Sequence, residues 1–352
     1  MGSTSRSHYY SVIKKIASLA GLWPYQNQKM RIFCLSLVTL STFSIIVPQM
    51  AKFVVCKGDL QCIFQTLAGH MLAVITLIKL YTCCFNQYKI KILIDWLFME
   101  WDELKTPEER EIMQRYAETG RRYSLGYSLY CFITGFLFIC LSLIPPILDV
   151  ALPLNESRPV LPAYPGHYFV DEREYFTYTF LHAIVAWEIA VTGIVAHDCM
   201  LLTYIEHVCS ILTLAGFAQL IEDTFSLTLA IQIVINTIMI SITLLQITQQ
   251  NAGILIMVRY VLFVLSQLIH LFCLSFEGQK LIDHSLQTRD KIYNSPWYKM
   301  SAQSQKMLMF VMEKALNPIF LSACKIYIFS IENFTTVVQT SMSYFTVLAT
   351  LE

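Results

Sequence analysis

The sequence predicts an all-α, polytopic membrane protein in which residues 1–352 form a single domain of seven transmembrane helices. Hydrophobic residues make up 55% of the chain. Charged residues make up only 14%, whereas soluble domains carry about 25%. This is too little charge to cover a water-facing surface, so a soluble globular enzyme is not expected. Lys+Arg and Asp+Glu are equal at 25 each, so there is no net positive field to attract nucleic acid.

Seven segments are apolar and long enough for a crossing, which needs about 20 residues. They are 32–50, 62–85, 123–148, 175–197, 224–245, 253–276 and 318–351. The fifth and sixth come from one uncharged run, Thr224–Val258, which is too long for one crossing and is interrupted by polar residues at Gln246–Gly253. The seventh is expected to begin near Asn317-Pro318, because Asn caps helices well and proline suits the first turn.

The distribution of positive charge predicts the orientation. Segments on the side of the N-terminus carry eighteen Lys and Arg residues, and those on the other side carry four. Positive loops stay in the cytoplasm, so the N-terminus is predicted to be cytoplasmic and the C-terminus extracellular. The sequon Asn155-Glu156-Ser157 falls in a predicted outer loop and is a candidate glycosylation site. G-protein-coupled receptors have the opposite orientation, so that class is not expected.

No motif for phosphate binding, zinc hydrolysis or a nucleophilic serine occurs, and the histidines have no metal-binding spacing. We therefore expect no enzyme activity, no cofactor and no metal. Cys56 and Cys62 both fall at the first predicted outer loop, where a disulfide and two free thiols are both open alternatives.

Ionisable residues inside spans cost roughly 2.5–3.5 kcal/mol each, so they are candidates for function. They are Lys79, Glu188, Arg259, Lys325 and Glu332. The alternative is that Lys79 and Lys325 extend to a membrane interface and that Glu188 pairs with a neighbouring span.

The last predicted span has two different faces. Helical spacing places one stripe at Thr336, Thr340, Ser343, Val347 and Leu351. The opposite face carries Val337, Val338, Met342 and Phe345. A polar stripe that ends in two apolar residues suits a pore-lining helix with a hydrophobic gate. Ordinary helix packing through small polar residues is the alternative.

Several motifs carry a family resemblance. They are Gly21-Leu22-Trp23-Pro24, Leu161-Pro162-Ala163-Tyr164, Ser295-Pro296-Trp297-Tyr298, Asn317-Pro318 and the end Thr340–Leu348. With them the chain resembles the insect odorant receptors over nearly its whole length. The related gustatory receptors typically end in a Thr-Tyr…Gln-Phe signature, and this chain has Ser343-Tyr344…Leu351-Glu352 instead.

The resemblance implies an odorant-binding subunit of a ligand-gated, non-selective cation channel. Such a subunit forms a heterotetramer with the common co-receptor, Orco, in the dendrite membrane of olfactory neurons. A gustatory-type channel that acts without Orco is the alternative. The family's seventh span lines the pore, and its gate aligns with Val347 and Leu351.

The family's odorant pocket lies in the outer half of the membrane, among spans two, three, four and six. Helical face and aromatic content select eight candidate residues there, and burial in the core is the alternative for each. They are His70, Phe132, Gly135, Phe136, Ile139, Trp187, Tyr260 and Phe263.

One region departs from the family pattern. Family members usually have a long basic stretch between spans four and five, whereas Asp198–Asp223 contains no Lys or Arg. The chain is expected to be shorter than its relatives by several tens of residues at this point.

Overall fold

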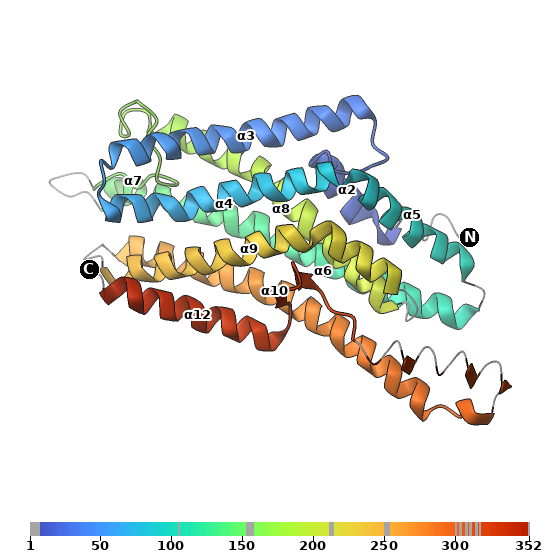
Figure 1. Cartoon of the computed structure of the whole chain (residues 1–352). Helices are drawn as coiled ribbons and strands as arrows, with labels where there is room; N and C mark the ends of the chain where they lie inside the picture. The colour runs from blue at the N-terminus through green and yellow to red at the C-terminus, as the bar shows by residue number, and fades with distance from the viewer. Residues whose placement is uncertain are drawn as a thin grey trace.

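The chain folds into an elongated helical bundle, which confirms the predicted all-α class (Figure 1). The structure is a computed structural model. It describes residues 8–104, 106–152, 158–210, 215–249, 254–299 and 301–350, the last apart from 303, 304, 307, 308, 310, 311, 314, 315 and 317. Six helices in these ranges are long and apolar enough to cross a membrane by length and composition.

The first three helices and the disulfide beside them agree with the sequence pattern. A short helix α2, Ser11–Leu19, precedes α3, Gln28–Val55, whose N-cap Asn27 accepts a hydrogen bond from the Lys29 backbone N–H at 3.0 Å. Helix α4, Leu60–Phe85, is capped in the same way by Asp59. Cys56 and Cys62 form a disulfide across the tight turn between α3 and α4, which decides between the two alternatives.

The next helices are marked by a strong start signal and a proline break. Helix α5, Gln87–Glu103, is followed by α6, Pro107–Cys140. Thr106 and Glu109 form a reciprocal capping box at the start of α6. The helix then passes through a 3-10 turn, η1, Leu141–Leu143, into α7, Ile144–Ala151. The Pro-Pro pair at 145 and 146 removes two backbone donors, so α6 does not continue as one straight helix.

Three long helices form the middle of the chain. They are α8, Phe176–Ser210, α9, Ala215–Gln249, and α10, Ile254–Asn294. Helix α9 ends within the polar run expected to separate spans five and six, and α10 begins at Ile254, directly after it. Helix α8 extends well past residue 197, so Asp198 lies inside a helix and not in a loop. Its continuation to Ser210 and the start of α9 at Ala215 occupy most of Asp198–Asp223, the segment expected to connect spans four and five.

The last helix begins later than the sequence predicts. A 3-10 turn, η2, Trp297–Lys299, comes first, and two short antiparallel strands, β1, Ser322–Ala323, and β2, Tyr327–Ile328, precede α12, Ile331–Thr350. Cys324 and Lys325 adopt left-handed backbone angles, which turn the chain back on itself and exclude a helix there. The α12 N-terminus is capped by Ser330, whose hydroxyl accepts from the Asn333 backbone N–H at 3.1 Å.

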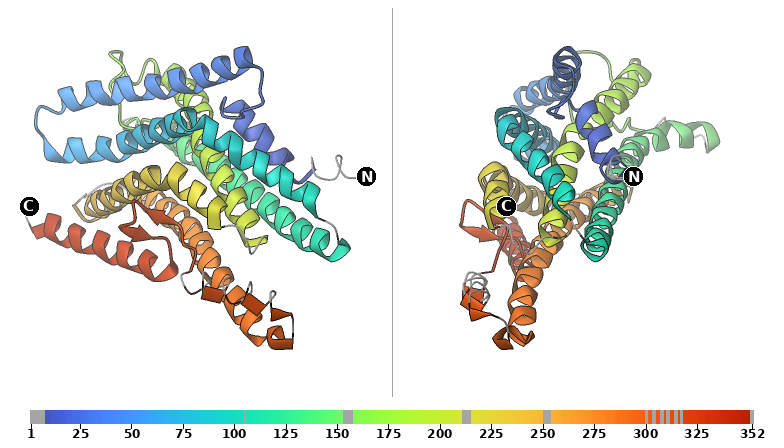
Figure 2. Two further views of the ribbon diagram at one scale, coloured as in Figure 1. Left: turned by 45° about the vertical axis from the view of Figure 1, so that its right-hand side comes forward. Right: turned by 90° about the vertical axis from the view of Figure 1, so that its right-hand side faces the viewer.

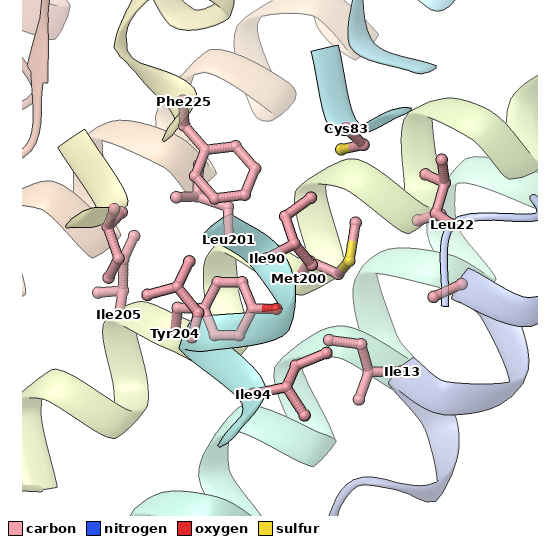
Figure 3. Close-up of a cluster of buried hydrophobic side chains, with 14 of the residues drawn as sticks. Ile13, Leu22, Cys83, Ile90, Ile94, Met200, Leu201, Tyr204, Ile205 and Phe225 are labelled. Carbon is pink, nitrogen blue, oxygen red and sulfur yellow. The ribbon is translucent and has the colours of Figure 1, made fainter. Parts of the chain in front are cut away.

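Helix α8 is the central element of the bundle. It packs against α2, α3, α4, α6, α9 and α10, and the other helices surround it in the end-on view (Figure 2). From Val195 to Cys209 every residue is buried, which is the pattern of a helix enclosed on all sides. Figure 3 shows part of its largest apolar cluster, where Met200, Leu201 and Tyr204 meet Ile90 and Phe225 from neighbouring helices.

Helix α12 lies along the outside of the bundle, against α9 and α10 (Figures 1 and 2). Its C-terminal end is at the end of the bundle opposite α5. Its polar stripe lowers its hydropathy, which is the reason that it is not among the six apolar spans of the described residues.

Candidate functional site

The core of the candidate ligand site is a contact between α6 and α8. A Cβ added to Gly135 of α6 would lie 3.2 Å from Nε1 of Trp187 of α8. A larger side chain at 135 would therefore displace the indole. Phe132 and Trp187 both pack against the same buried cluster, and Ile139 is buried in the neighbouring cluster that Trp187 also contacts. Four of the eight predicted pocket residues are thus brought together.

A second group forms between α10, α6 and α4. Phe263 of α10 packs against Ile75 and Met239, and its ring centroid lies 6.2 Å from that of Phe138 on α6. Tyr260, one turn before Phe263 on α10, is half-buried. Phe138 is not among the residues that the sequence predicts, although it lies three residues after Gly135 and so close to the same helical face.

The predicted residue His70 lies on α4 and meets α3. Its ring packs edge-on against Phe53 at a centroid distance of 5.4 Å. Its Nδ1 atom and both side-chain amide atoms of Gln49 are buried without a hydrogen-bond partner in the described part of the chain. The amide of Gln49 lies against Gly69, the neighbour of His70. Buried polar atoms of this kind can bind a hydroxyl or carbonyl group of a small ligand, because an unpaired group is otherwise costly.

Phe136 is not brought together with this group. Its side chain is 46% exposed on α6, so its place in a ligand pocket stays a prediction. Lipid-facing and pocket-facing residues are equally apolar in a membrane helix, and the sequence pattern did not fix the rotation of α6.

A strap of residues 158–170 lies beside the site and is held by Arg259 of α10. The guanidinium donates to the carbonyl oxygens of Pro162, at 2.7 Å, and Ala163, and it lies 4.8 Å from the centroid of the Phe138 ring. Arg259 is 7% exposed, so a buried cation is stabilised by backbone carbonyls and by an aromatic face. This residue therefore connects the loop before α8 to span six.

The strap is also bonded to α3 and α8. Tyr168 contacts the Tyr164 hydroxyl and Nδ1 of His182, the latter at 3.0 Å, and His182 Nε2 lies 3.0 Å from the Ser44 hydroxyl. Burial raises the pKa of Tyr168 to about 12, so this phenol remains a hydrogen-bond donor at neutral pH.

A hollow of about 430 Å³, counted with its open mouth, lies between this strap and the start of α8. Pro162, Tyr164, Tyr168, Phe176 and Phe180 line it with apolar and aromatic surface, and none of the eight predicted pocket residues takes part.

The predicted pore face of α12 points away from the rest of its own bundle. Thr336, Ser343 and Val347 are exposed, and Thr340 is half-buried. The face packed against α9 and α10 contains Val337 and Ser341. Met342, which the sequence pattern places on the face opposite the polar stripe, is 48% exposed. Leu351, the second predicted gate residue, and the sequon Asn155 lie outside the described residues.

The remaining four ionisable residues of the predicted spans lie in different surroundings. Lys79 does not reach a membrane interface, because its Nζ lies 2.7 Å from Oδ1 of Asp198 and both side chains are 1% exposed. Glu188 is half-buried near Gly135, and its Oε1 has no hydrogen-bond partner among the described residues. Lys325 lies in the exposed turn between β1 and β2, and Glu332 lies exposed in the first turn of α12. Within the described ranges no group of three His, Cys, Asp or Glu residues is arranged to hold a metal ion.

Comparison with known proteins finds similarity to odorant receptors. The profile of the family described as 7tm Odorant receptor matches residues 212–342. Odorant receptor Or2 of Anopheles gambiae is 29% identical over 105 residues, which are 30% of this chain and 27% of that protein. The odorant receptor coreceptor of Drosophila melanogaster is 26% identical over 136 residues, which are 38% of this chain and 27% of that protein.

The fold comparison extends to the whole chain. The structure resembles that of the insect olfactory receptor OR5 from Machilis hrabei in complex with eugenol, with a TM-score of 0.79 and 13% sequence identity over 99% of both chains. The chain is similar to insect odorant receptors in fold over its whole length and in sequence over part of it. The six long apolar helices of its described residues are those of a multi-pass membrane protein. The matched sequence spans about a quarter of the length of these curated relatives, so the similarity in sequence is concentrated in one part of the chain.

Proposed function

We propose that the chain is the odorant-binding subunit of a ligand-gated, non-selective cation channel. In this proposal it assembles with the Orco co-receptor as a heterotetramer in the dendrite membrane of olfactory neurons. The observation that carries the proposal is the combination of the family match over residues 212–342 with the exposed polar face of α12. The face of α12 that is not packed on its own bundle is available to line a water-filled path between subunits.

The ligand in this proposal is a small volatile molecule that binds at the α6/α8 contact around Gly135 and Trp187. Burying about 250 Å² of apolar surface at about 25 cal/mol per Å² yields roughly 6 kcal/mol. This corresponds to a dissociation constant in the tens of micromolar. Shape and aromatic contacts would set selectivity, with Gln49 and His70 available for one hydrogen-bonding group. Odorant binding would open the channel only if the open state holds the ligand better than the closed state.

Expression in cells without native receptors tests the proposal. The chain is expressed alone, the co-receptor alone, and the two together, and currents are recorded for a panel of odorants. Odorant currents that appear only for the pair support the proposal. Currents from the chain alone support the gustatory-type alternative. Absence of current from a pair that reaches the cell surface and responds to a co-receptor agonist contradicts odorant gating by this chain.

A further inference from the structure

Five polar side chains, each from a different helix, meet in the interior of the bundle. They are Lys79 of α4, Tyr127 of α6, Asp198 of α8, Gln232 of α9 and His270 of α10, and we call them the five-helix network. Lys79, Tyr127, Asp198 and Gln232 are buried, and the His270 side chain is only 15% exposed. Polar groups in such an interior must be paired, so the network restricts how the five helices can sit relative to one another.

The contacts form one continuous chain that ends on the Asp198 carboxylate. Lys79 Nζ lies 2.7 and 2.8 Å from its two oxygens, and the Tyr127 hydroxyl donates to Oδ2 at 2.7 Å. The Tyr127 oxygen also lies 2.7 Å from Nδ1 of His270, whose Nε2 contacts the Gln232 amide nitrogen. One arrangement of protons satisfies all of these contacts: Gln232 donates to His270, His270 donates to Tyr127, and Tyr127 donates to Asp198. His270 is neutral in this arrangement.

The network lies on the helical faces that carry the candidate ligand site. Tyr127 is eight residues from Gly135 on α6, and His270 is seven residues from Phe263 on α10, so both pairs share a face two turns apart. On the other side, the Ser241 hydroxyl of α9 donates to the Ser341 carbonyl of α12 at 3.0 Å. Helices α6, α9 and α10 therefore connect the ligand site, the network and the predicted pore helix.

We propose that the five-helix network holds the channel closed, and that an odorant bound at the α6/α8 contact and against Phe263 of α10 opens it by separating His270 from Tyr127. The inference rests on the proposed function and names the positioning residues that couple the ligand site to the pore. A ligand that packs against Trp187 and Phe263 favours a different spacing of α6 and α10. Because the Tyr127 and His270 bond is directional, such a change of spacing breaks it. The Tyr127–His270 contact is made in the closed state and broken in the open state, and ligand binding shifts the equilibrium between these two states.

The test is Tyr127→Phe, which removes the hydroxyl and both of its hydrogen bonds but keeps the ring. The pair with the co-receptor should show a larger current without odorant and an odorant EC50 that is lower by roughly fivefold, the factor expected for the loss of one hydrogen bond, the one to His270, that only the closed state makes. Tyr123→Phe is the matched control, because Tyr123 is on the same helix and 41% exposed. It should behave like the unmodified chain.

A second variant keeps the test decisive if Tyr127→Phe does not reach the membrane. Gln232→Leu removes only the bond to His270, and a smaller decrease of the EC50 is expected. The double variant Tyr127→Phe/Gln232→Leu should shift the EC50 by less than the sum of the two single shifts on a logarithmic scale, because both act on one chain of contacts.

The outcomes separate this inference from the proposed function. If the unmodified pair gives no odorant current, the proposed function fails. If it responds and the surface-expressed Tyr127→Phe variant has an unchanged or higher EC50, the coupling role of the network is overturned. The same applies to Gln232→Leu if Tyr127→Phe is not expressed.

Discussion

Asp198 places a carboxylate inside a helix that is buried on every side. The Asp198 carboxylate is stabilised by Lys79, which donates to both of its oxygens, and by His197, whose Nδ1 lies 2.8 Å from Oδ1. Removing one member of a buried ion pair leaves an uncompensated charge, whereas replacing both by apolar residues is often tolerated. The Lys79–Asp198 pair therefore predicts how single and double substitutions change the stability of the protein.

Asp198→Leu should destabilise the protein by about 3–5 kcal/mol, because it leaves the Lys79 ammonium unpaired in the bundle interior. Lys79→Met/Asp198→Leu should recover most of that loss. Thermal denaturation of the detergent-solubilised protein and surface labelling measure both variants. A double variant as unstable as Asp198→Leu would show that the ion pair is not the cause.

The sequence indicates Lys79 as a candidate but not its partner. The apolar run before Asp198 predicts a span that ends at residue 197, which places Asp198 in a loop. In the structure α8 continues to Ser210, with polar residues paired across helices and not exposed to water. A hydropathy pattern cannot separate a buried polar helix from a loop, because burial in this case depends on partners far away in the sequence.

At the scale of the element, α12 has one packed face and one free face. Ser341 is buried and bonded to α9, whereas Ser343, two residues later, is exposed. The polar stripe was predictable from helical spacing, because every hydroxyl on it has a fixed angular position. The start of the helix was not predictable, because the left-handed turn at Cys324 and Lys325 has no strong sequence signal.

Cysteine substitution tests which face of α12 meets water. In a background with Cys324→Ser, which removes an exposed native thiol, Ser343→Cys should react with a water-soluble thiol reagent during odorant stimulation and lose current. Ser341→Cys is the buried control and should react at least roughly tenfold more slowly, because burial suppresses thiolate reactivity. Equal rates for both positions would exclude the exposed stripe as the pore face.

At the scale of the whole molecule, the orientation in the membrane decides which end of the bundle receives the odorant. The charge bias predicts a cytoplasmic N-terminus and an extracellular C-terminus. The C-terminal end of α12 lies at the end of the bundle opposite α5, a helix in the segment between the second and third predicted spans. That segment is predicted to be cytoplasmic, so this is the arrangement that the orientation requires (Figure 1).

Epitope tags at the two termini test this orientation in intact cells. The C-terminal tag should bind antibody without permeabilisation, and the N-terminal tag only after it. Asn155→Gln should also remove a glycosidase-sensitive shift in mobility. A tag at the N-terminus that is accessible in intact cells would contradict the orientation, and with it the outer position of the ligand site.

The measurement that most directly tests odorant binding at the α6/α8 contact is the odorant tuning of Gly135→Ala, expressed with the co-receptor. The added Cβ would lie 3.2 Å from the Trp187 indole and should change the relative potencies of small and bulky odorants. The control is Gly126→Ala on the same helix, where an added Cβ meets nothing within 4 Å. A changed potency order in Gly135→Ala alone, with intact currents from a co-receptor agonist, is the predicted result. Unchanged tuning in both variants would contradict a ligand site at this contact.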